Sequence, residues 1–222
     1  MALTKYNYNS FDVTPVASKA LGFNSDADGL TTAAEGSMVL IKTLTASSDS
    51  TLEFVDGASD VVLDNTYPVY VFKWINIHPS ANAHLTFNMS IDTGSNYNVT
   101  KTTTLFWSAH NESDVASEID YLSSQDLAQS TDFQIIGYQI TTMNDAGGSG
   151  YLYLFNPSST TFVKHFMGNA NVVSIDPSDP YSINTYCAGY GNTTSAVDAV
   201  QFKLSTGNMD AGTIKLYGIK DS

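Results

Sequence analysis

The sequence predicts an all-β protein: an antiparallel β-sandwich of jelly-roll type with an irregular N-terminal arm and one short helical insertion. Two observations favour this class. Short apolar and aromatic stretches recur at a spacing of roughly eight to fifteen residues, with Gly-, Asn-, Asp- and Pro-containing turns between them. Near the C-terminal end, residues 200–204 and 212–219 alternate apolar and polar side chains on either side of a turn-like run, a pattern typical of a β-hairpin.

The chain divides into an arm, residues 1–37, and a sandwich domain, residues 38–222. In the arm, Tyr6 and Tyr8 alternate with polar residues, but Pro15 breaks the pattern, so an irregular segment is expected. The 222 residues of the chain are enough for one large all-β domain with such an appendage.

Eleven runs in the domain have strand character. Residues 69–77 are β-branched and aromatic almost throughout, which predicts a central strand. Residues 85–92 alternate strictly, which predicts a strand with one buried and one solvated face. The other predicted strands are residues 38–44, 51–54, 103–109, 133–140, 151–155, 162–166, 183–190, 200–204 and 212–219.

The acidic stretch at residues 111–132 differs from the rest of the domain. It is rich in Ser and Ala, and Val115, Ile119 and Leu122 recur in it at helical spacing. This periodicity predicts the short helical insertion.

The charge balance excludes two classes of partner. The net charge is −13, and all nine basic residues are lysines. Nucleic-acid recognition depends on basic surfaces and on arginine forks, and an acidic chain is repelled by phosphate. Anionic membrane surfaces are disfavoured for the same reason. We therefore expect no nucleic acid among the partners and no membrane insertion.

The composition also bears on the compartment. Charged residues make up 14% of the chain, against roughly 25% in an ordinary soluble domain. Cys187 is the single cysteine, residues 1–10 lack an apolar signal core, and no run reaches membrane-spanning length. Two interpretations remain open: a virion component made in a bacterial cytoplasm and released by lysis, or a secreted protein whose signal has been removed.

Residues 24–35 match the ligand spacing of a twelve-residue calcium loop. Asn24, Asp26 and Asp28 would supply side-chain oxygens, Leu30 its backbone carbonyl, and Glu35 the bidentate carboxylate. The alternative is an Asx-rich surface turn that binds no metal, because these residue types favour turns by themselves. Calcium is the only cofactor that the sequence suggests.

Catalytic constellations are missing from the sequence. The four histidines, His78, His84, His110 and His165, have no metal-ligand spacing, and the four glutamates have no evident partner for glycoside hydrolysis. No Gly-x-Ser-x-Gly motif occurs, and Cys187 has no base beside it. The sequence therefore predicts a protein that is not an enzyme.

Several aromatic residues lie in or near predicted loops, where rings can stack on sugars. The candidates for such ligand binding are Trp107, Tyr181, Tyr186 and Tyr190. Covering of a sandwich edge, or contact with another subunit, explains the same residues equally well.

Residues 189–208 (GYGNTTSAVDAVQFKLSTGN), continued by residues 212–220 (GTIKLYGIK), resemble the closing block of uncharacterised virion structural proteins of tailed bacteriophages, especially marine ones. Residues 69–79 and 156–165 are similar to earlier blocks of the same group. The resemblance extends from about Ile41 to the end of the chain. It supplies no site residues.

This resemblance implies a non-enzymatic structural protein that is exposed on the virion, either in the tail and fibre apparatus or as capsid decoration. It implies assembly in the cytoplasm of the bacterial host and contacts with other virion proteins. It also implies a homo-oligomer, with a trimer as the first expectation. The alternative hypothesis, from a different class, is a carbohydrate-binding module that recognises a host surface polysaccharide.

Overall fold

The computed structural model describes residues 21–23, 30–32, 36–174 and 178–221. Within these ranges all regular structure is β-strand, and no helix is present. The strands are β1 (Leu21–Phe23), β2 (Leu30–Thr32), β3 (Met38–Thr45), β4 (Thr51–Val55), β5 (Val69–Pro79), β6 (Ala83–Ser90), β7 (Lys101–Asn111), β8 (Ser117–Tyr121), β9 (Gln134–Ile140), β10 (Gly148–Phe155), β11 (Lys164–Val173), β12 (Tyr181–Gly191), β13 (Ala199–Leu204) and β14 (Met209–Ile219).

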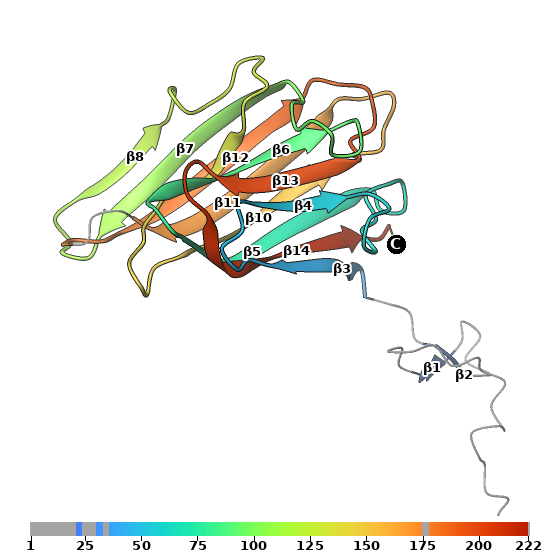
Figure 1. The fold of residues 1–222 in the computed structure, drawn as a ribbon, viewed down its shortest axis with the longest axis horizontal. Coiled ribbons are helices and arrows are strands. Elements are labelled where there is room, and N and C mark those ends of the chain that lie inside the picture. The colour runs from blue at the N-terminus through green and yellow to red at the C-terminus, as the bar shows by residue number, and fades with distance from the viewer. Residues whose placement is uncertain (1–20, 24–29, 33–35, 175–177, 222) are drawn as a thin grey trace, which may run out of the picture.

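The domain is built from two antiparallel sheets (Figure 1). The large sheet has eight strands in the order β3-β14-β5-β10-β11-β12-β7-β8, and the small sheet has four in the order β4-β13-β6-β9. Strand β5 lies between β14 and β10, which confirms the central position predicted for residues 69–77. The predicted all-β class is likewise confirmed, and the two sheets are consistent with a β-sandwich.

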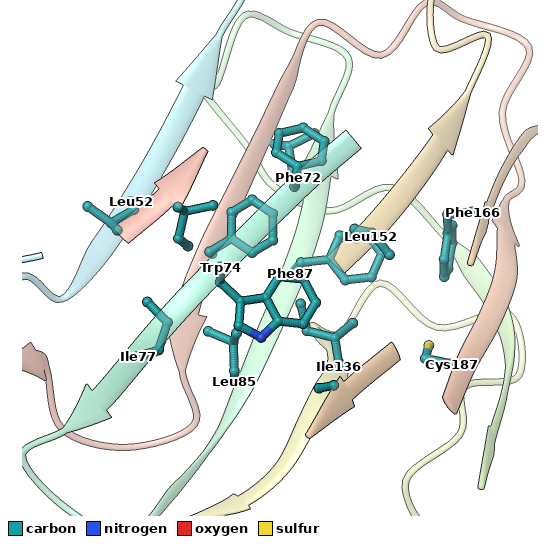
Figure 2. Close-up of a cluster of buried hydrophobic side chains, with 14 of the residues drawn as sticks. Leu52, Phe72, Trp74, Ile77, Leu85, Phe87, Ile136, Leu152, Phe166 and Cys187 are labelled. Carbon is teal, nitrogen blue, oxygen red and sulfur yellow. The ribbon is translucent and has the colours of Figure 1, made fainter. Parts of the chain in front are cut away.

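A cluster of phenylalanine rings joins the two sheets (Figure 2). Phe72 of the large sheet lies between two rings of the small sheet, with its centroid 5.3 Å from that of Phe54 and 5.2 Å from that of Phe202. Phe87 of the small sheet meets Phe166 of the large sheet edge to face at 4.9 Å. These rings are at most 1% exposed, so the core forms where the inner faces of the sheets meet.

The predicted C-terminal hairpin is wrong. Strand β13 pairs with β4 and β6 in the small sheet, whereas β14 pairs with β3 and β5 in the large sheet. Residues 205–208 carry the chain from one sheet to the other, and the Asn208 N–H donates a 2.8 Å hydrogen bond to the Ser80 hydroxyl on the way. Alternation of apolar and polar residues shows which side chains face the interior, but it does not identify the neighbouring strand. Two consecutive strands give the same pattern whether they pair in one sheet or lie in opposite sheets.

The predicted short helix is also wrong. Residues 117–121 form strand β8, whose Ser117 pairs with His110 and whose Tyr121 pairs with Phe106 of β7. Val115 and Ile119 are both 80% exposed, so their helical spacing does not reflect a buried face. The open edge of β7 offers unpaired backbone groups, and this segment satisfies them as a strand.

Two smaller differences concern the arm and one strand. Part of the predicted irregular arm forms a short ladder, in which Leu21 of β1 pairs with Thr32 of β2. The strand expected at residues 162–166 begins at Lys164 and continues to Val173. Residues 167–173 were not predicted as strand, because Gly168 and the two polar residues Asn169 and Asn171 interrupt the apolar pattern there.

Strand β6 is buried on both faces, which contradicts the half-solvated strand predicted for residues 85–92. Asn88 on its polar side is fully buried. The Asn88 amide group donates to the carbonyls of Tyr97 (2.7 Å) and Thr131 (2.9 Å), so the segments before β7 and β9 cover this face. The covering segments were not visible in the periodicity of β6 itself.

Lys101 is buried beside Asn88, under the same two segments that precede β7 and β9. It is 0% exposed, and its Nζ donates hydrogen bonds to the Asn88 Oδ1 (2.6 Å) and to the Val99 carbonyl (2.7 Å). Desolvation lowers the pKa of Lys101 from 10.5 to about 7, and the charge of Asp132 opposes this shift. The neutral amine is therefore the favoured form in the folded protein at alkaline pH.

This burial predicts that stability rises with pH. Between pH 7 and pH 10.5 the unfolded chain binds more protons at Lys101 than the folded chain, so the free energy of unfolding increases across this window, by a few kcal/mol. Urea unfolding at a series of pH values measures the increase. Lys101→Met is expected to remove most of the slope, and the exposed Lys220→Met serves as the control that keeps it. A Lys101→Met protein with the wild-type slope would contradict the assignment.

Candidate functional site

The surface that the small sheet leaves open is the outer face of the large sheet. Nine of the fourteen exposed large hydrophobic side chains among the described residues project from it, as the strand registers show. They are Met38, Leu40, Ile75, Phe106, Ile119, Tyr121, Tyr151, Met167 and Tyr186. An exposed apolar surface gathered on one face marks an interaction site more often than scattered single residues do.

One row of side chains crosses five strands of this face. Tyr151 of β10 is paired with Asn169 of β11, which is paired with Tyr186 of β12. Tyr186 is in turn opposite Phe106 of β7, and Phe106 is opposite Tyr121 of β8. Four strand spacings give the row a length of about 19 Å. Four of its five members are aromatic, so the row presents ring faces and edges to solvent.

A groove of about 310 Å³ runs beside this row. Its walls include the rings of Tyr151, Tyr186 and Phe106, of which the last two stack with centroids 4.9 Å apart and planes 10° apart. Ala188 also lines the groove, and it is paired with Met167 of β11 on one side and with Thr104 of β7 on the other. The single methyl of Ala188 leaves open the space that a larger side chain would fill.

Three asparagines lie next to the groove and form an amide cluster. The Asn169 Nδ2 donates to the Asn184 Oδ1 (2.6 Å), and the Asn184 Nδ2 donates to the Tyr186 hydroxyl (2.9 Å). The Asn171 Nδ2 donates to the Ser182 hydroxyl (2.9 Å). Within the described part of the chain, Oδ1 of Asn169 and of Asn171 accepts no hydrogen bond. The cluster therefore offers ordered acceptors to a ligand.

Two further hollows meet the amide cluster. One, of about 630 Å³, lies at the ends of β5, β10 and β11 and is lined by Asn76, Ser149 and Asn171 among others. The other, of about 410 Å³, lies between β12, β7 and β8 and is lined by Asn184 and Ser108 among others. Asn169 lines the central groove, so each hollow contains one amide of the cluster.

The strands that carry the groove are almost free of formal charge. Strands β7, β10, β11 and β12 contain no Asp, Glu or Arg, and their two lysines, Lys101 and Lys164, are buried on the inner side. The whole chain has a net charge of −13, so its carboxylates lie elsewhere. The central groove presents rings, amides and hydroxyls, which suit binding and not proton transfer.

The four aromatic residues singled out from the sequence are placed differently. Tyr186 lines the groove, and Tyr190 lies farther along the same side of β12, with its ring centroid 6.2 Å from that of His165. Trp107 projects to the inner side and packs on Tyr138 at 5.7 Å, with its buried Nε1 unpaired in the described structure. Tyr181 is half-buried against the core.

Other members of the groove were missed by the sequence reasoning. Tyr151 and Phe106 lie within predicted strands and were assigned no ligand role, and Asn169 lies in the part of β11 that was not predicted. The sequence did contain a signal for the exposure of Tyr151. Tyr151 and Tyr153 alternate with Leu152 and Leu154, so one side of β10 had to expose aromatic rings unless a further layer covered it.

The predicted calcium loop lies mostly outside the described residues. Asn24, Asp26, Asp28 and Glu35 are not among them, and Leu30 begins strand β2. The described residues contain no group of three or more His, Cys, Asp or Glu side chains placed to hold a metal ion. Calcium binding by this loop stays a prediction.

Cys187 lies beneath the groove, on the inner side of β12, and is 3% exposed. Burial raises the pKa of its thiol, which keeps the sulfur protonated and unreactive in the folded protein. This environment agrees with the small apolar packing role suggested by its isolation in the sequence.

No protein-family model, curated protein or solved structure matches the chain. In the ranges that the structure describes, no helix is long and apolar enough to cross a membrane. Function is therefore inferred from the sequence and from the geometry of the outer face.

Proposed function

We propose that this chain is a non-enzymatic structural protein of a tailed bacteriophage virion, exposed on the particle in the tail and fibre apparatus or as capsid decoration. The resemblance of residues 189–208 and 212–220 to such proteins supports this function. The low proportion of charged residues and the absence of an intrachain disulfide also fit a lysis-released particle surface.

The observation that carries the proposal is the strand order, which supports a sandwich of jelly-roll type. Eight strands pair as a long hairpin rolled up: β3 with β14, β4 with β13, β5 with β10, and β6 with β9. The roll closes where β14 meets β5 and β13 meets β6. The pairs β7-β8 and β11-β12 are insertions that widen one sheet. Jelly rolls recur in viral capsid proteins and in lectins.

Labelling of intact phage particles with an antibody against this chain tests the virion role. We expect label on the particle surface, and its position on head or tail selects between capsid decoration and the tail apparatus. Particles incubated with a pre-immune antibody provide the control. Absence of label from particles that contain the protein by mass spectrometry would contradict surface exposure, and absence of the protein from particles would contradict the proposal as a whole.

In such a setting the chain is proposed to form a homo-oligomer, with a trimer as the first expectation. Light scattering of the purified protein at micromolar concentration measures the mass directly. A monodisperse monomer would count against self-association.

A second candidate function is carbohydrate binding, with a host surface polysaccharide as the ligand. The groove between Tyr151, Tyr186 and Phe106 favours it, because exposed rings beside amide groups supply both the apolar contact and the hydrogen bonds that sugars need. The two functions are compatible if the protein is the part of the virion that meets the host.

Replacement of the groove aromatics tests this second function. Tyr151→Ala and Tyr186→Ala are each expected to weaken binding to a glycan array by about tenfold, as loss of a binding anchor does. Phe162→Ala removes an aromatic ring that is 68% exposed but lies outside the strands, and is expected to leave binding unchanged. Wild-type affinity in Tyr151→Ala and Tyr186→Ala, as in the control Phe162→Ala, would contradict a role for the groove.

A further inference from the structure

The three hollows of the outer face are neighbours, because each is lined by one asparagine of the amide cluster. Asn169 and Asn171 are two residues apart on one side of β11, which separates their side chains by about 7 Å. Asn169 is joined to Asn184 by a 2.6 Å hydrogen bond. A ligand long enough to extend beyond the central groove therefore meets an asparagine of the cluster in each of the adjoining hollows.

The available hydrogen-bonding groups select a class of ligand. Amide and hydroxyl groups both donate and accept, which matches sugar hydroxyls. The strands that line the groove, β7, β10, β11 and β12, present no lysine or arginine on the outer face that could pair with a carboxylate, sulfate or phosphate. Lys73 of the neighbouring strand β5 is opposite Tyr151, and its Nζ lies over the ring of Tyr217, 5.4 Å from the centroid. An anionic group bound in the groove would lose its hydration without an opposite charge among the groove residues, and the net charge of −13 on the chain would repel it.

We propose that the outer face binds an uncharged polysaccharide, with sugar rings on Tyr151, Tyr186 and Phe106 and with their hydroxyl groups bonded by Asn169, Asn171 and Asn184. This proposal rests on the carbohydrate-binding function proposed above and specifies its ligand and its site.

The dimensions of the site indicate an internal stretch of polymer and not a single terminal sugar. The row from Tyr151 to Tyr121 is about 19 Å long, which exceeds the width of one ring. The two other hollows are open to solvent and extend the surface beyond the central groove, one toward β5 and the other toward β8. Affinity is therefore expected to grow with the length of the oligosaccharide.

The amide cluster also explains why the site is ordered before a ligand arrives. The Asn184 Nδ2 is held by the Tyr186 hydroxyl, and the Asn184 Oδ1 is held by Asn169. A preorganised group loses less conformational entropy on binding than a free side chain. Tyr186→Phe keeps the ring but removes this acceptor, so it separates the stacking contribution from the positioning of Asn184.

The experiment is calorimetric titration of the full chain with two series of probes. The neutral series comprises glucan, mannan and galactan oligosaccharides from disaccharide to hexasaccharide, and the anionic series comprises alginate and galacturonate oligosaccharides of the same lengths. We expect binding by at least one neutral series, with affinity that rises with length, and binding to the anionic series that is weaker by about tenfold or more.

The variants locate the site. Ala188→Phe fills the central groove while it keeps every ring and amide in place, and it is expected to abolish binding. Asn169→Ala is expected to weaken binding about tenfold, whereas Tyr186→Phe causes a smaller loss. Asn96→Ala removes an exposed amide that is bonded to Asp92 away from the outer face, and is the matched control.

The outcomes separate this inference from the function on which it rests. Equal affinity for the neutral and anionic series overturns the uncharged ligand but leaves carbohydrate binding standing. Binding of a neutral series that survives Ala188→Phe overturns the site. Binding of no series overturns both. Light scattering of Ala188→Phe that shows dissociation of an oligomer assigns the outer face to a second copy of the chain, and likewise overturns the inference.

Discussion

Contact between the inner faces of the two sheets is the constraint on which the rest of the structure depends. Phe72 meets Phe54 and Phe202 across the interface, and Phe87 meets Phe166, so the buried rings come from strands far apart in the sequence. Burial of large aromatic side chains is the main favourable term for such a domain. Once those rings face inward, the pleat forces every second residue of the same strands outward.

The second side of the large sheet is left exposed by this rule. The small sheet packs on the inner face of the large sheet, so the outward residues of β10, β11, β12 and β7 point away from it and meet solvent. In those positions the chain carries tyrosine, phenylalanine and asparagine, whose rings and amides lie in adjoining registers. A long apolar sheet face is a hazard for aggregation unless it has a partner. A ligand rich in hydroxyl groups fits the chemistry of this face.

Buried polar groups place a second constraint on the fold, because each of them needs a hydrogen-bond partner. Asn88 and Lys101 bury an amide and an amine that must hydrogen-bond to each other and to the Val99 carbonyl. Burial of such groups is tolerated only when their partners are in place. The segments before β7 and β9 therefore have to fold onto β6. This arrangement lowers the free energy of unfolding at low pH, where Lys101 is protonated, because burial disfavours its charged form.

The sequence by itself determined the all-β class, the central place of residues 69–77 and the identity of nearly every strand, because alternation of side chains is a local property that the pleat imposes. It did not determine pairing. The alternation in residues 200–204 and 212–219 predicts a hairpin, yet the two strands lie in opposite sheets. The spacing around Ile119 predicts a helix, yet these residues form an edge strand. Tyr186 was recognised as a candidate ligand residue, but Tyr151, Phe106 and Asn169 join it only through registers between separate strands. Tertiary structure alone decided which strands lie side by side and therefore which outward residues share one surface, since pairing depends on contacts between segments far apart in the sequence.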